Sequence, residues 1–458
     1  MQQTEKIFLA KSEVKAQDLE HRRKINFNIS QYDHAFQKGR KQFSDMDTAR
    51  ERAKNVKWRA TENLDKYLEE FERIFTSHGG QVIWAENTEQ AQEEILKICK
   101  AKNARTIVKS KSMVTEEIHL NDFLKENNIE SIETDLGEYI QQLDGEPPYH
   151  IVTPAMHKSK EDIAQLFHEK LQVESGMTPE QLTLVTRNKL RQKFQEAEIG
   201  ITGANFILAD IGGIAITENE GNARLSTTFP KTHIAITGIE KVLPSVNDLG
   251  LFWPLLATYG TGQNLTVYNT IFTGPRKEAE IDGPEEMYVI LLDNGRTNIL
   301  ANEAVRESLY CIRCGACLNA CPVYKNIGGH TYDTTYTGPI GSVITPHMRG
   351  MKEYKHLSYA SSLCGACTAA CPVKIDIHEL LLENRHESVE SHFTSKSEKM
   401  AWYLWKRASL SRKMMDLANG NTKNKVINKM FGKAWGERRN LPDFAPKSFN
   451  QLWKERRG

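Results

Sequence analysis

The sequence lacks any long hydrophobic run. No stretch of 18 or more apolar residues occurs in the 458 residues, and the nearest approach, residues 199–217, is interrupted by Asn205, Asp210 and glycines. A membrane-spanning helix needs about 20 consecutive apolar residues, so this stretch predicts strands and turns instead. Residues 1–23 also lack the apolar core of a secretory leader. We therefore expect a cytoplasmic protein without a transmembrane segment.

The chain also lacks net charge, because 60 Lys and Arg residues are balanced by 59 Asp and Glu residues. This balance gives no support to a nucleic-acid-binding protein. It hides a local asymmetry, since residues 396–458 hold 16 basic and only 5 acidic side chains. We expect this basic, helical tail to dock on an acidic partner or on the acidic remainder of the chain. Hydrophobic residues make up 39% of the sequence, which predicts a folded protein.

Cysteine is scarce, and its distribution excludes a disulfide framework. Of the eight cysteines, Cys99 lies in a helical pattern, and the other seven fall between residues 311 and 371. Disulfides would be spread along a short secreted chain, whereas these cysteines are separated by two or three residues within a long one. This clustering favours metal ligation.

The first cysteine group spans residues 311–322 and reads Cys311-Ile-Arg-Cys314-Gly-Ala-Cys317-Leu-Asn-Ala-Cys321-Pro322. It matches the ferredoxin run C-x2-C-x2-C-x3-C-P without a gap. Three thiolates at this spacing let one loop hold three corners of a cubane cluster, and the small residues after Cys314 allow backbone amides to approach it. The proline after Cys321 directs that cysteine to a different cluster. A structural zinc site usually has two separated pairs of ligands, so the spacing favours iron and sulfide over zinc.

The second group, Cys364-Gly-Ala-Cys367-Thr-Ala-Ala-Cys371-Pro372, repeats the core and the ending of the first. The repeat predicts two clusters. Where a fourth cysteine is expected, the sequence has Ser361. The crossed-ligand rule of two-cluster ferredoxins assigns the first cluster to Cys311, Cys314, Cys317 and Cys371, and the second to Cys321, Cys364 and Cys367.

A cluster with three thiolates has an open iron, a ligand other than cysteine, or three irons in place of four. Ser361, Ser362 and His356 are near enough in sequence to supply the missing ligand. We favour a four-iron cluster whose fourth position is labile or is held by another residue. Iron–sulfur clusters carry electrons but specify no substrate, so the substrate must be sought elsewhere in the chain.

Short apolar runs resembling strands alternate with helical stretches between about residue 80 and residue 300, which predicts an α/β domain. Before them, Leu64, Leu68, Phe71 and Phe75 form the apolar face of a helix. The first 50 residues are charged and irregular. They predict either an extended arm over a partner or over the protein's own body, or a loosely packed N-terminal extension. The expected strands are residues 81–85, 105–109, 130–133, 150–153, 204–209, 213–217, 233–237, 265–268 and 287–292.

Three features of this domain are suited to bind a ligand. Lys109, Lys111 and Ser112 lie in a strand-to-helix turn, where free amides and the helix dipole favour an anion. Glu218 begins a loop rich in carboxylates and amides, which is suited to position a polar substrate or a catalytic carboxylate. Arg276 follows Gly-Pro in another loop and is suited to hold a carboxylate or phosphate. The alternatives are an ordinary capped turn with solvated lysines, a tight turn held by Asn and Glu side chains, and an arginine that ties down its own loop.

Taken in order, these motifs resemble the lactate-utilisation iron–sulfur protein family, specifically the B subunit of a three-protein L-lactate oxidation system. The resemblance covers nearly the whole chain. Besides the two cysteine groups, it includes Lys109–Met113, Glu218–Asn222, Gly274–Arg276 and Phe444–Phe449.

The resemblance implies a lactate-utilisation α/β domain related to sugar-phosphate isomerases and CoA transferases, followed by an α-helical ferredoxin-like dicluster domain and a helical basic tail. It implies two four-iron clusters, of which the second has only three cysteine ligands, as is usual in this family. It also implies two partners, namely a cysteine-rich iron–sulfur subunit and a second protein with a lactate-utilisation domain. The expected N-terminal helical extension spans residues 1–60, and the lactate-utilisation α/β domain spans residues 61–300. The two-cluster ferredoxin-type domain is expected over residues 301–385, and the basic helical C-terminal region over residues 386–458.

The leading hypothesis is an electron-transfer subunit of an oxidoreductase complex that converts L-lactate to pyruvate, rather than an enzyme complete by itself. No catalytic residue is assigned. A protein that senses redox state or a small anion is one alternative, and the same machinery acting on another 2-hydroxy acid is a second. The candidates for binding a substrate or anion are Lys109, Lys111, Ser112, Glu218 and Arg276.

Overall fold

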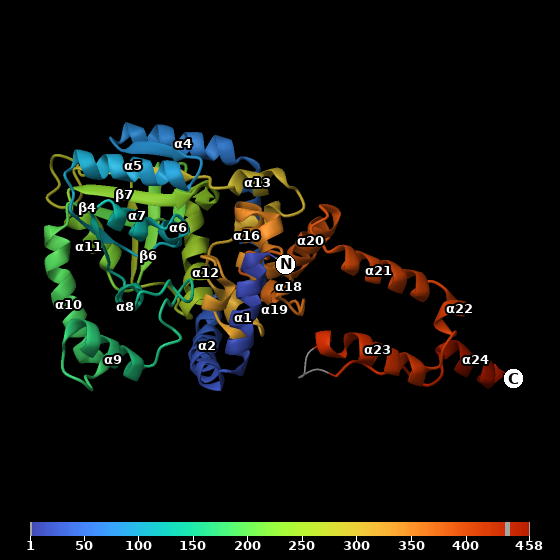
Figure 1. Cartoon of the computed structure of the whole chain (residues 1–458). Coiled ribbons are helices and arrows are strands. Elements are labelled where there is room, and N and C mark those ends of the chain that lie inside the picture. Colours follow the sequence, from blue (N-terminus) through green and yellow to red (C-terminus); the bar gives the residue numbers. More distant parts are fainter. Residues whose placement is uncertain (1, 436–439, 458) are drawn as a thin grey trace. The chain divides into compact units, whose positions relative to one another are not determined.

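The computed structural model describes residues 2–435 and 440–457. The chain divides into two compact units, Met1–Glu387 and Ser388–Gly458. The first unit contains a parallel β-sheet and all the cysteines, and the second consists of helices joined by loops (Figure 1).

A six-stranded sheet forms the centre of the first unit, and all its neighbouring strands are parallel. In spatial order its strands are β1 (Gln81–Ala85), β10 (Glu286–Leu292), β7 (Thr232–Gly238), β4 (Ile199–Gly203), β2 (Thr106–Lys109) and β3 (Glu130–Glu133). Parallel sheets are covered on both faces, so their strands are apolar along their whole length. All seven residues of β7 are buried.

Successive residues of a central strand pack against helices on opposite faces. Ile234 and Ile236 of β7 pack with α5 (Thr88–Ala101) and α7 (Leu120–Glu126), whereas Ala235 packs with α4 (Leu64–Ser77). Near β2, the face that α4 covers continues under α8 (Leu136–Asp144) and α10 (Pro179–Glu196). The further helices of this region are α6 (Met113–Glu117), α9 (Lys160–Leu171), α11 (Asn222–Thr228) and α12 (Leu249–Thr261).

A second sheet of four short strands is formed by segments that lie in sequence between β4 and β10, and it packs with both the parallel sheet and the cysteine-rich helices. Its order is β8 (Val242–Leu243), β5 (Phe206–Leu208), β6 (Gly213–Glu218) and β9 (Tyr268–Phe272). Strand β6 is antiparallel to β5 and to β9. The 3-10 turns η2 (Ile239–Lys241) and η3 (Val246–Asp248) flank β8.

The cysteine groups lie among short helices, and the N-terminal helices complete the same apolar core. The helices that follow β10 are α13 (Arg296–Ala301), η4 (Arg306–Tyr310), α14 (Ala316–Ala320), α15 (Tyr324–Ile327), η5 (His330–Tyr332), α16 (Gly338–Arg349), α17 (Met351–Tyr354), α18 (His356–Tyr359), α19 (Ala366–Ala369) and α20 (Ile377–Glu390). The N-terminal ones are α1 (Gln3–Gln17), α2 (Leu19–Gly39), η1 (Arg40–Gln42) and α3 (Met46–Glu62). Of the two predictions for the first 50 residues, the loosely packed extension is wrong, because Phe8, Ile25 and Ile29 are buried in the core that holds Leu318. The alternative prediction, an arm over the protein's own body, agrees with this packing.

Most predicted strands are present, and two differ. Residues 150–153 form bends rather than a strand, and β9 begins at Tyr268, where the predicted strand ends. Strand β4 was not predicted, because two glycines interrupt its apolar pattern. Helix α10 begins with a capping box, in which the Thr178 hydroxyl accepts from the amide of Gln181 and the Gln181 side chain accepts from the amide of Thr178.

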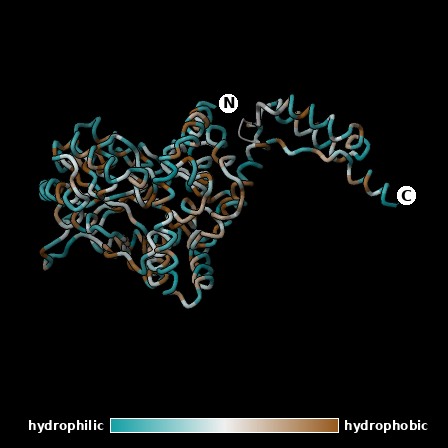
Figure 2. The backbone as a smooth tube through the Cα atoms, turned by 90° about the horizontal axis from the view of Figure 1, so that it is seen from below, coloured by the Kyte–Doolittle hydropathy of each residue, from teal (hydrophilic) through white to brown (hydrophobic). Residues whose placement is uncertain are grey.

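The second unit is helical, as the sequence predicted. Its helices are α21 (Lys396–Ser409), α22 (Arg412–Met415), α23 (Gly420–Trp435) and α24 (Phe449–Arg457). Hydrophilic and hydrophobic stretches alternate along them (Figure 2), and Trp402 and Trp405 are exposed. Within the described ranges, no helix has both the length and the apolar character needed to cross a membrane.

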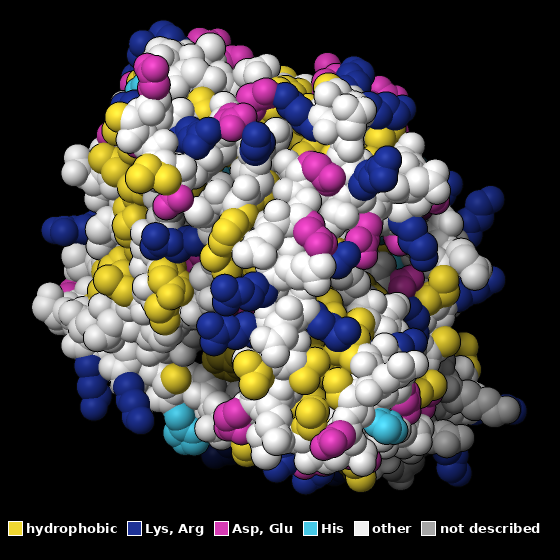
Figure 3. Space-filling view, turned by 90° about the vertical axis from the view of Figure 1, so that its left-hand side faces the viewer, with side chains coloured by type: hydrophobic (Ala, Val, Ile, Leu, Met, Phe, Trp, Pro, Cys, Tyr) yellow, Lys and Arg dark blue, Asp and Glu magenta, His cyan; other side chains and the backbone are white. Residues whose placement is uncertain are grey.

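The surface of the first unit carries charges of both signs. On the face shown in Figure 3, Lys and Arg side chains are interspersed with Asp and Glu, with hydrophobic side chains between them. This mixture agrees with the near-zero net charge of the chain and shows no uniformly basic surface on that face.

The close packing of β4 against α11 generates the first prediction. A Cβ atom added at Gly200 would lie 1.7 Å from the backbone oxygen of Ser226, whereas nothing lies within 4 Å of one added at Gly250 in α12. Gly200→Ala should therefore destabilise the protein by about 3 kcal/mol through overpacking. Gly250→Ala should be neutral or stabilise it by up to about 1 kcal/mol, because alanine favours helix. Urea unfolding of both variants measures the difference, and equal midpoints would contradict the described packing.

Candidate functional site

Four cysteines from both sequence groups lie around one cavity. Cys311, Cys314 and Cys317 come from the first group, and Cys371 is the last cysteine of the second. The rest of the wall is largely apolar and includes Ile312, Ile340, Val373, Ile375 and Ile377. The cavity therefore presents sulfur atoms as its main polar groups.

The backbone around these cysteines is shaped to approach sulfur. The amide of Arg313 donates to Cys311 Sγ at 3.4 Å, and the amide of Ile375 donates to Cys371 Sγ at 3.3 Å. Gly315 and Gly365 occupy equivalent places in the two groups and have nearly the same left-handed conformation, with φ of 78° and 76°. A glycine adopts this conformation without strain, so the internal repeat of the sequence is also a repeat of backbone structure.

Burial and mutual proximity shape the chemistry of this first set. Burial raises the pKa of the Cys314 thiol, and the neighbouring Cys311 and Cys371 sulfurs raise it further. Burial likewise raises the pKa of Cys371 to about 12. Four thiolates crowded in an apolar cavity need a cationic partner, and the iron of an iron–sulfur cluster supplies one. The donor set and the amide–sulfur hydrogen bonds fit such a group.

The other three cysteines form a second set, in which Cys321 and Cys367 are buried and Cys364 is exposed. Burial and the nearby sulfurs of Cys321 and Cys364 together raise the pKa of Cys367 to about 11. Cys364 is exposed, and hydrogen bonds from the amide of Ala366 and the hydroxyl of Ser362 lower its pKa. Three sulfurs fit a cluster that takes its remaining ligand from elsewhere.

The residues considered for that fourth position have other contacts. Ser361 Oγ accepts a hydrogen bond from the amide of Leu363 at 3.1 Å. The ring of His356 lies 5.4 Å from the ring of Phe8, between centroids. Of the two hydroxyls, that of Ser362 is the one bonded to a cysteine of the second set.

A polar cavity of about 370 Å³ lies at the carboxyl ends of the parallel strands. Its lining includes residues 110–112, which follow β2, and residues 203–205 at the end of β4. From β2 the chain passes first to β3 on one side and later to β4 on the other, so β2 and β4 flank a switch point of the sheet. Open α/β sheets bind ligands at such points, and the volume is typical of small-molecule sites.

Arg313 connects this polar cavity with the first cysteine set, because it lies between Cys311 and Cys314 and lines both cavities. Its guanidinium carbon lies 4.4 Å from the centroid of the Tyr336 ring, and Nη2 lies 3.3 Å from Glu240 Oε1. Nε and Nη1 are buried and have no hydrogen-bond partner among the described residues. Each of these unpaired donors leaves the guanidinium able to hydrogen-bond a further acceptor, such as one oxygen of a carboxylate.

Two further side chains of the polar cavity titrate near neutral pH. Burial and the neighbouring charge of Arg313 together lower the pKa of Lys241 to about 7. Burial and the neighbouring charge of Asp135 together raise the pKa of Glu220 to about 7. Such shifts are frequent at functional sites, where a group must exchange protons at neutral pH.

The structure brings together three of the five predicted anion-binding residues. Lys111, Ser112 and Glu218 line the polar cavity. Lys111 Nζ donates to the backbone oxygen of Val152, and the Ser112 hydroxyl caps α6. Glu218 accepts hydrogen bonds from two amides at the start of α11.

Lys109 and Arg276 lie elsewhere. Lys109 is fully buried, and its Nζ lies 2.6 Å from Glu133 Oε1 and 3.2 Å from Glu116 Oε1. Arg276 Nη2 lies 2.8 Å from Glu285 Oε1. Neither residue lines the polar cavity, and both are engaged in ion pairs within the chain.

Sequence reasoning did not identify Arg313, Lys241 or Tyr336 as residues of this site. The sequence did hold an indication of Arg313, because this basic residue stands between two predicted cluster ligands, Cys311 and Cys314. Lys241 and Tyr336 had none, because only the tertiary fold brings η2 and the segment before α16 to the ends of β2 and β4.

Comparison with known proteins identifies two domain families in the chain. The LUD domain family matches residues 68–292, and the 4Fe-4S dicluster domain family matches residues 307–375. Lactate utilization protein B of Bacillus velezensis is 49% identical over 77% of this chain and 74% of its own length. The corresponding figures are 48%, 76% and 73% for lactate utilization protein B of Bacillus subtilis. They are 44%, 89% and 87% for the uncharacterized electron transport protein YkgF of Escherichia coli.

The different surroundings of the two lysines generate the second prediction. Lys109→Met leaves the carboxylates of Glu116, Glu133 and Glu138 buried without their cation, which should cost about 3–5 kcal/mol of stability. Lys111→Met removes one bond to a backbone oxygen and should cost about 1.5 kcal/mol or less. Thermal unfolding of the two variants compares them. A Lys109 variant as stable as the Lys111 variant would contradict the structural role of Lys109.

Proposed function

This chain belongs to the family of lactate utilization protein B, and we propose that it is an iron–sulfur electron-transfer component of a multi-protein system that oxidises L-lactate to pyruvate. One observation carries the proposal: Arg313 lines both the polar cavity and the cavity of the first cysteine set. A carboxylate held by Arg313 would therefore lie beside the sulfur ligands. The names of the Bacillus and Escherichia coli relatives, which mention lactate utilization and electron transport, support the same assignment.

We assign the first cluster to the buried set Cys311, Cys314, Cys317 and Cys371, and the second to Cys321, Cys364 and Cys367. The shared cavity and the mutual electrostatic effects within each set support this division. When bound, such clusters accept and release one electron at a time. The amides of Arg313 and Ile375 would stabilise negative charge on the sulfurs they contact.

In the polar cavity, the chain's own residues would bind and orient the 2-hydroxy acid. Arg313 would hold the carboxylate through an unpaired guanidinium N–H, and protonated Lys241 and Lys111 would add positive charge. Conversion of a 2-hydroxy to a 2-oxo acid breaks the O–H bond and the C–H bond of the hydroxyl-bearing carbon, which releases two electrons and two protons. Glu220, whose pKa is about 7, is suited to receive the hydroxyl proton. We propose that a flavin or quinone of the assembled system accepts the hydrogen of the C–H bond with both electrons, and that the clusters carry these electrons onward one at a time.

The exposed position of Cys364 in the second set indicates where partners would dock. Cys314 and Cys317 are buried, whereas Cys364 is exposed. An exposed ligand lets a partner's redox group approach closely. We propose that the cysteine-rich iron–sulfur subunit docks beside Cys364, and that a second LUD-domain protein completes the complex. We also retain 1–60, 61–300, 301–385 and 386–458 as proposed domain boundaries.

The ligand assignment generates the third prediction. In oxygen-free preparations, Cys371→Ser should lose the iron and sulfide of the first cluster only, and Cys364→Ser those of the second only. Cys99→Ser is the matched control, because Cys99 is buried in the α/β core and lies in neither set. Iron and acid-labile sulfide are measured per chain, together with the EPR signal of the reduced protein.

The assignment predicts that each ligand variant retains about half of the wild-type iron and that the control retains all of it. Loss of the same EPR signal in both variants would contradict the division into two sets. A colourless wild-type protein, or one that contains zinc without sulfide, would contradict the proposal as a whole.

The unpaired donors of Arg313 generate the fourth prediction. Arg313→Gln should weaken binding of L-lactate about tenfold or more, because hydrogen bonds to charged groups contribute about 1.5–3 kcal/mol. Arg276→Gln is the control, since Arg276 lies outside the cavity. Calorimetric titration of the cluster-loaded proteins measures both affinities. Equal weakening by the two substitutions would contradict binding at this cavity.

The same titrations should depend on pH in a defined direction. As the pH rises through about 7, Lys241 loses its positive charge and Glu220 gains a negative one. The first change removes an attraction for the lactate carboxylate, and the second adds a repulsion. The affinity for L-lactate should therefore fall between about pH 6 and pH 8. Glu220→Gln should reduce this slope. An affinity that rises over this range would contradict the assigned electrostatics.

A further inference from the structure

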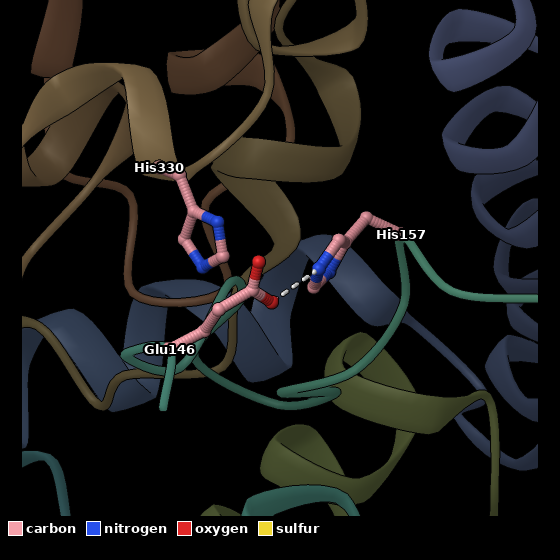
Figure 4. Close-up of side chains that lie close together, drawn as sticks. All are labelled: Glu146, His157 and His330. Carbon is pink, nitrogen blue, oxygen red and sulfur yellow. Dashed lines mark hydrogen bonds and ion pairs between the residues drawn. The ribbon is translucent and has the colours of Figure 1, made fainter. Parts of the chain in front are cut away.

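Three potential metal ligands converge at a place separate from the cysteine sets. Glu146 follows α8, His157 precedes α9, and His330 begins η5. One ligand atom of each lies within 4.8 Å of the other two. Figure 4 shows the three side chains pointing toward one another from different segments of the chain. Neither the polar cavity nor the cavity of the first cysteine set includes any of them.

The spacing is close to that of a tetrahedral metal site. Bonds of about 2.0–2.1 Å to zinc place neighbouring ligand atoms about 3.3 Å apart. His157 Nε2 lies 3.1 Å from Glu146 Oε2. Small side-chain movements would therefore bring all three atoms to bonding distance of one ion.

Neighbouring groups orient both imidazole rings. His330 Nε2 lies 2.8 Å from the backbone oxygen of Pro147, and because this oxygen only accepts, Nε2 carries the hydrogen. The lone pair of neutral His330 is then on Nδ1. The ring of Tyr149 stacks on that of His157 with centroids 4.4 Å apart, and it meets the ring of His330 edge-on at 4.9 Å. Such outer contacts are typical of metal-ligating histidines.

Glu146 also has a cationic neighbour. Lys158 Nζ lies 3.0 Å from Glu146 Oε2 and also pairs with Asp144. Lys158 therefore competes with any metal ion for Glu146.

We propose that Glu146, His157 and His330 bind one divalent transition-metal ion, with zinc as the preferred type, independently of the iron–sulfur clusters. Two imidazoles and one carboxylate are a recurrent zinc ligand set that leaves one position for water. The Glu146 side chain is 36% exposed, which gives an ion access from solvent. Because His330 belongs to the dicluster region and the other two ligands to the LUD domain, the ion would brace the contact between these regions.

Zinc retention by the cluster-loaded protein tests the site. Wild-type protein is equilibrated anaerobically with zinc sulfate and desalted, and zinc, iron and sulfide are then measured in the same sample. We expect one zinc per chain with iron and sulfide unchanged. His157→Gln and Glu146→Gln should each reduce zinc affinity at least tenfold. His34→Gln is the control, because His34 lies exposed on α2 and should leave affinity unchanged.

Lys158→Met supplies a test that does not depend on weakening the fold. Removing the competing ammonium should raise zinc affinity about tenfold, measured by calorimetry. A hydrogen-bonded cluster with no metal role would show no zinc retention in the wild type and no gain in this variant, and either result would overturn the proposal. Zinc retained equally by the His157 and His34 variants would also overturn it.

Discussion

Two buried arginines share the buried carboxylate of Glu240, and this interaction fixes the candidate site. Arg296 Nε lies 2.5 Å from Glu240 Oε2, and Arg313 Nη2 lies 3.3 Å from Glu240 Oε1. Arg296 also pairs with Glu117 at 2.8 Å. Buried charges are stable only when paired, so the network holds the first cysteine loop against η2, α6 and α13. The polar cavity and the first cysteine set therefore keep a fixed relation to each other.

This fixed relation gives the chain a direction for electron flow under the proposed function. The polar cavity lies at the sheet's switch point, Arg313 separates it from four largely buried cysteines, and the second set reaches the surface at Cys364. A substrate would be sheltered at one end, and a partner would have access at the other.

The parts of the site that sequence could predict are those in which spacing determines chemistry. The two cysteine runs predicted the dicluster domain and a crossed division of ligands, and the family comparison confirms the domain. Lys109 and Lys111 show the limit. They are two residues apart and chemically alike. Lys109, at the end of β2, is buried among the carboxyl groups of three glutamates, whereas Lys111 lines the polar cavity. Sequence pattern alone does not distinguish them, because the distinction depends on Glu133 and Glu138 from distant segments.

The central claim is that a 2-hydroxy acid bound beside Arg313 delivers electrons to the cysteine-bound centres. The most direct measurement is the visible absorbance of oxidised, cluster-loaded protein mixed anaerobically with L-lactate, alone and with its partner subunits. The account predicts bleaching with L-lactate in the assembled system and formation of pyruvate in proportion. Clusters that dithionite reduces fully, but that L-lactate leaves unchanged in every combination, would contradict it.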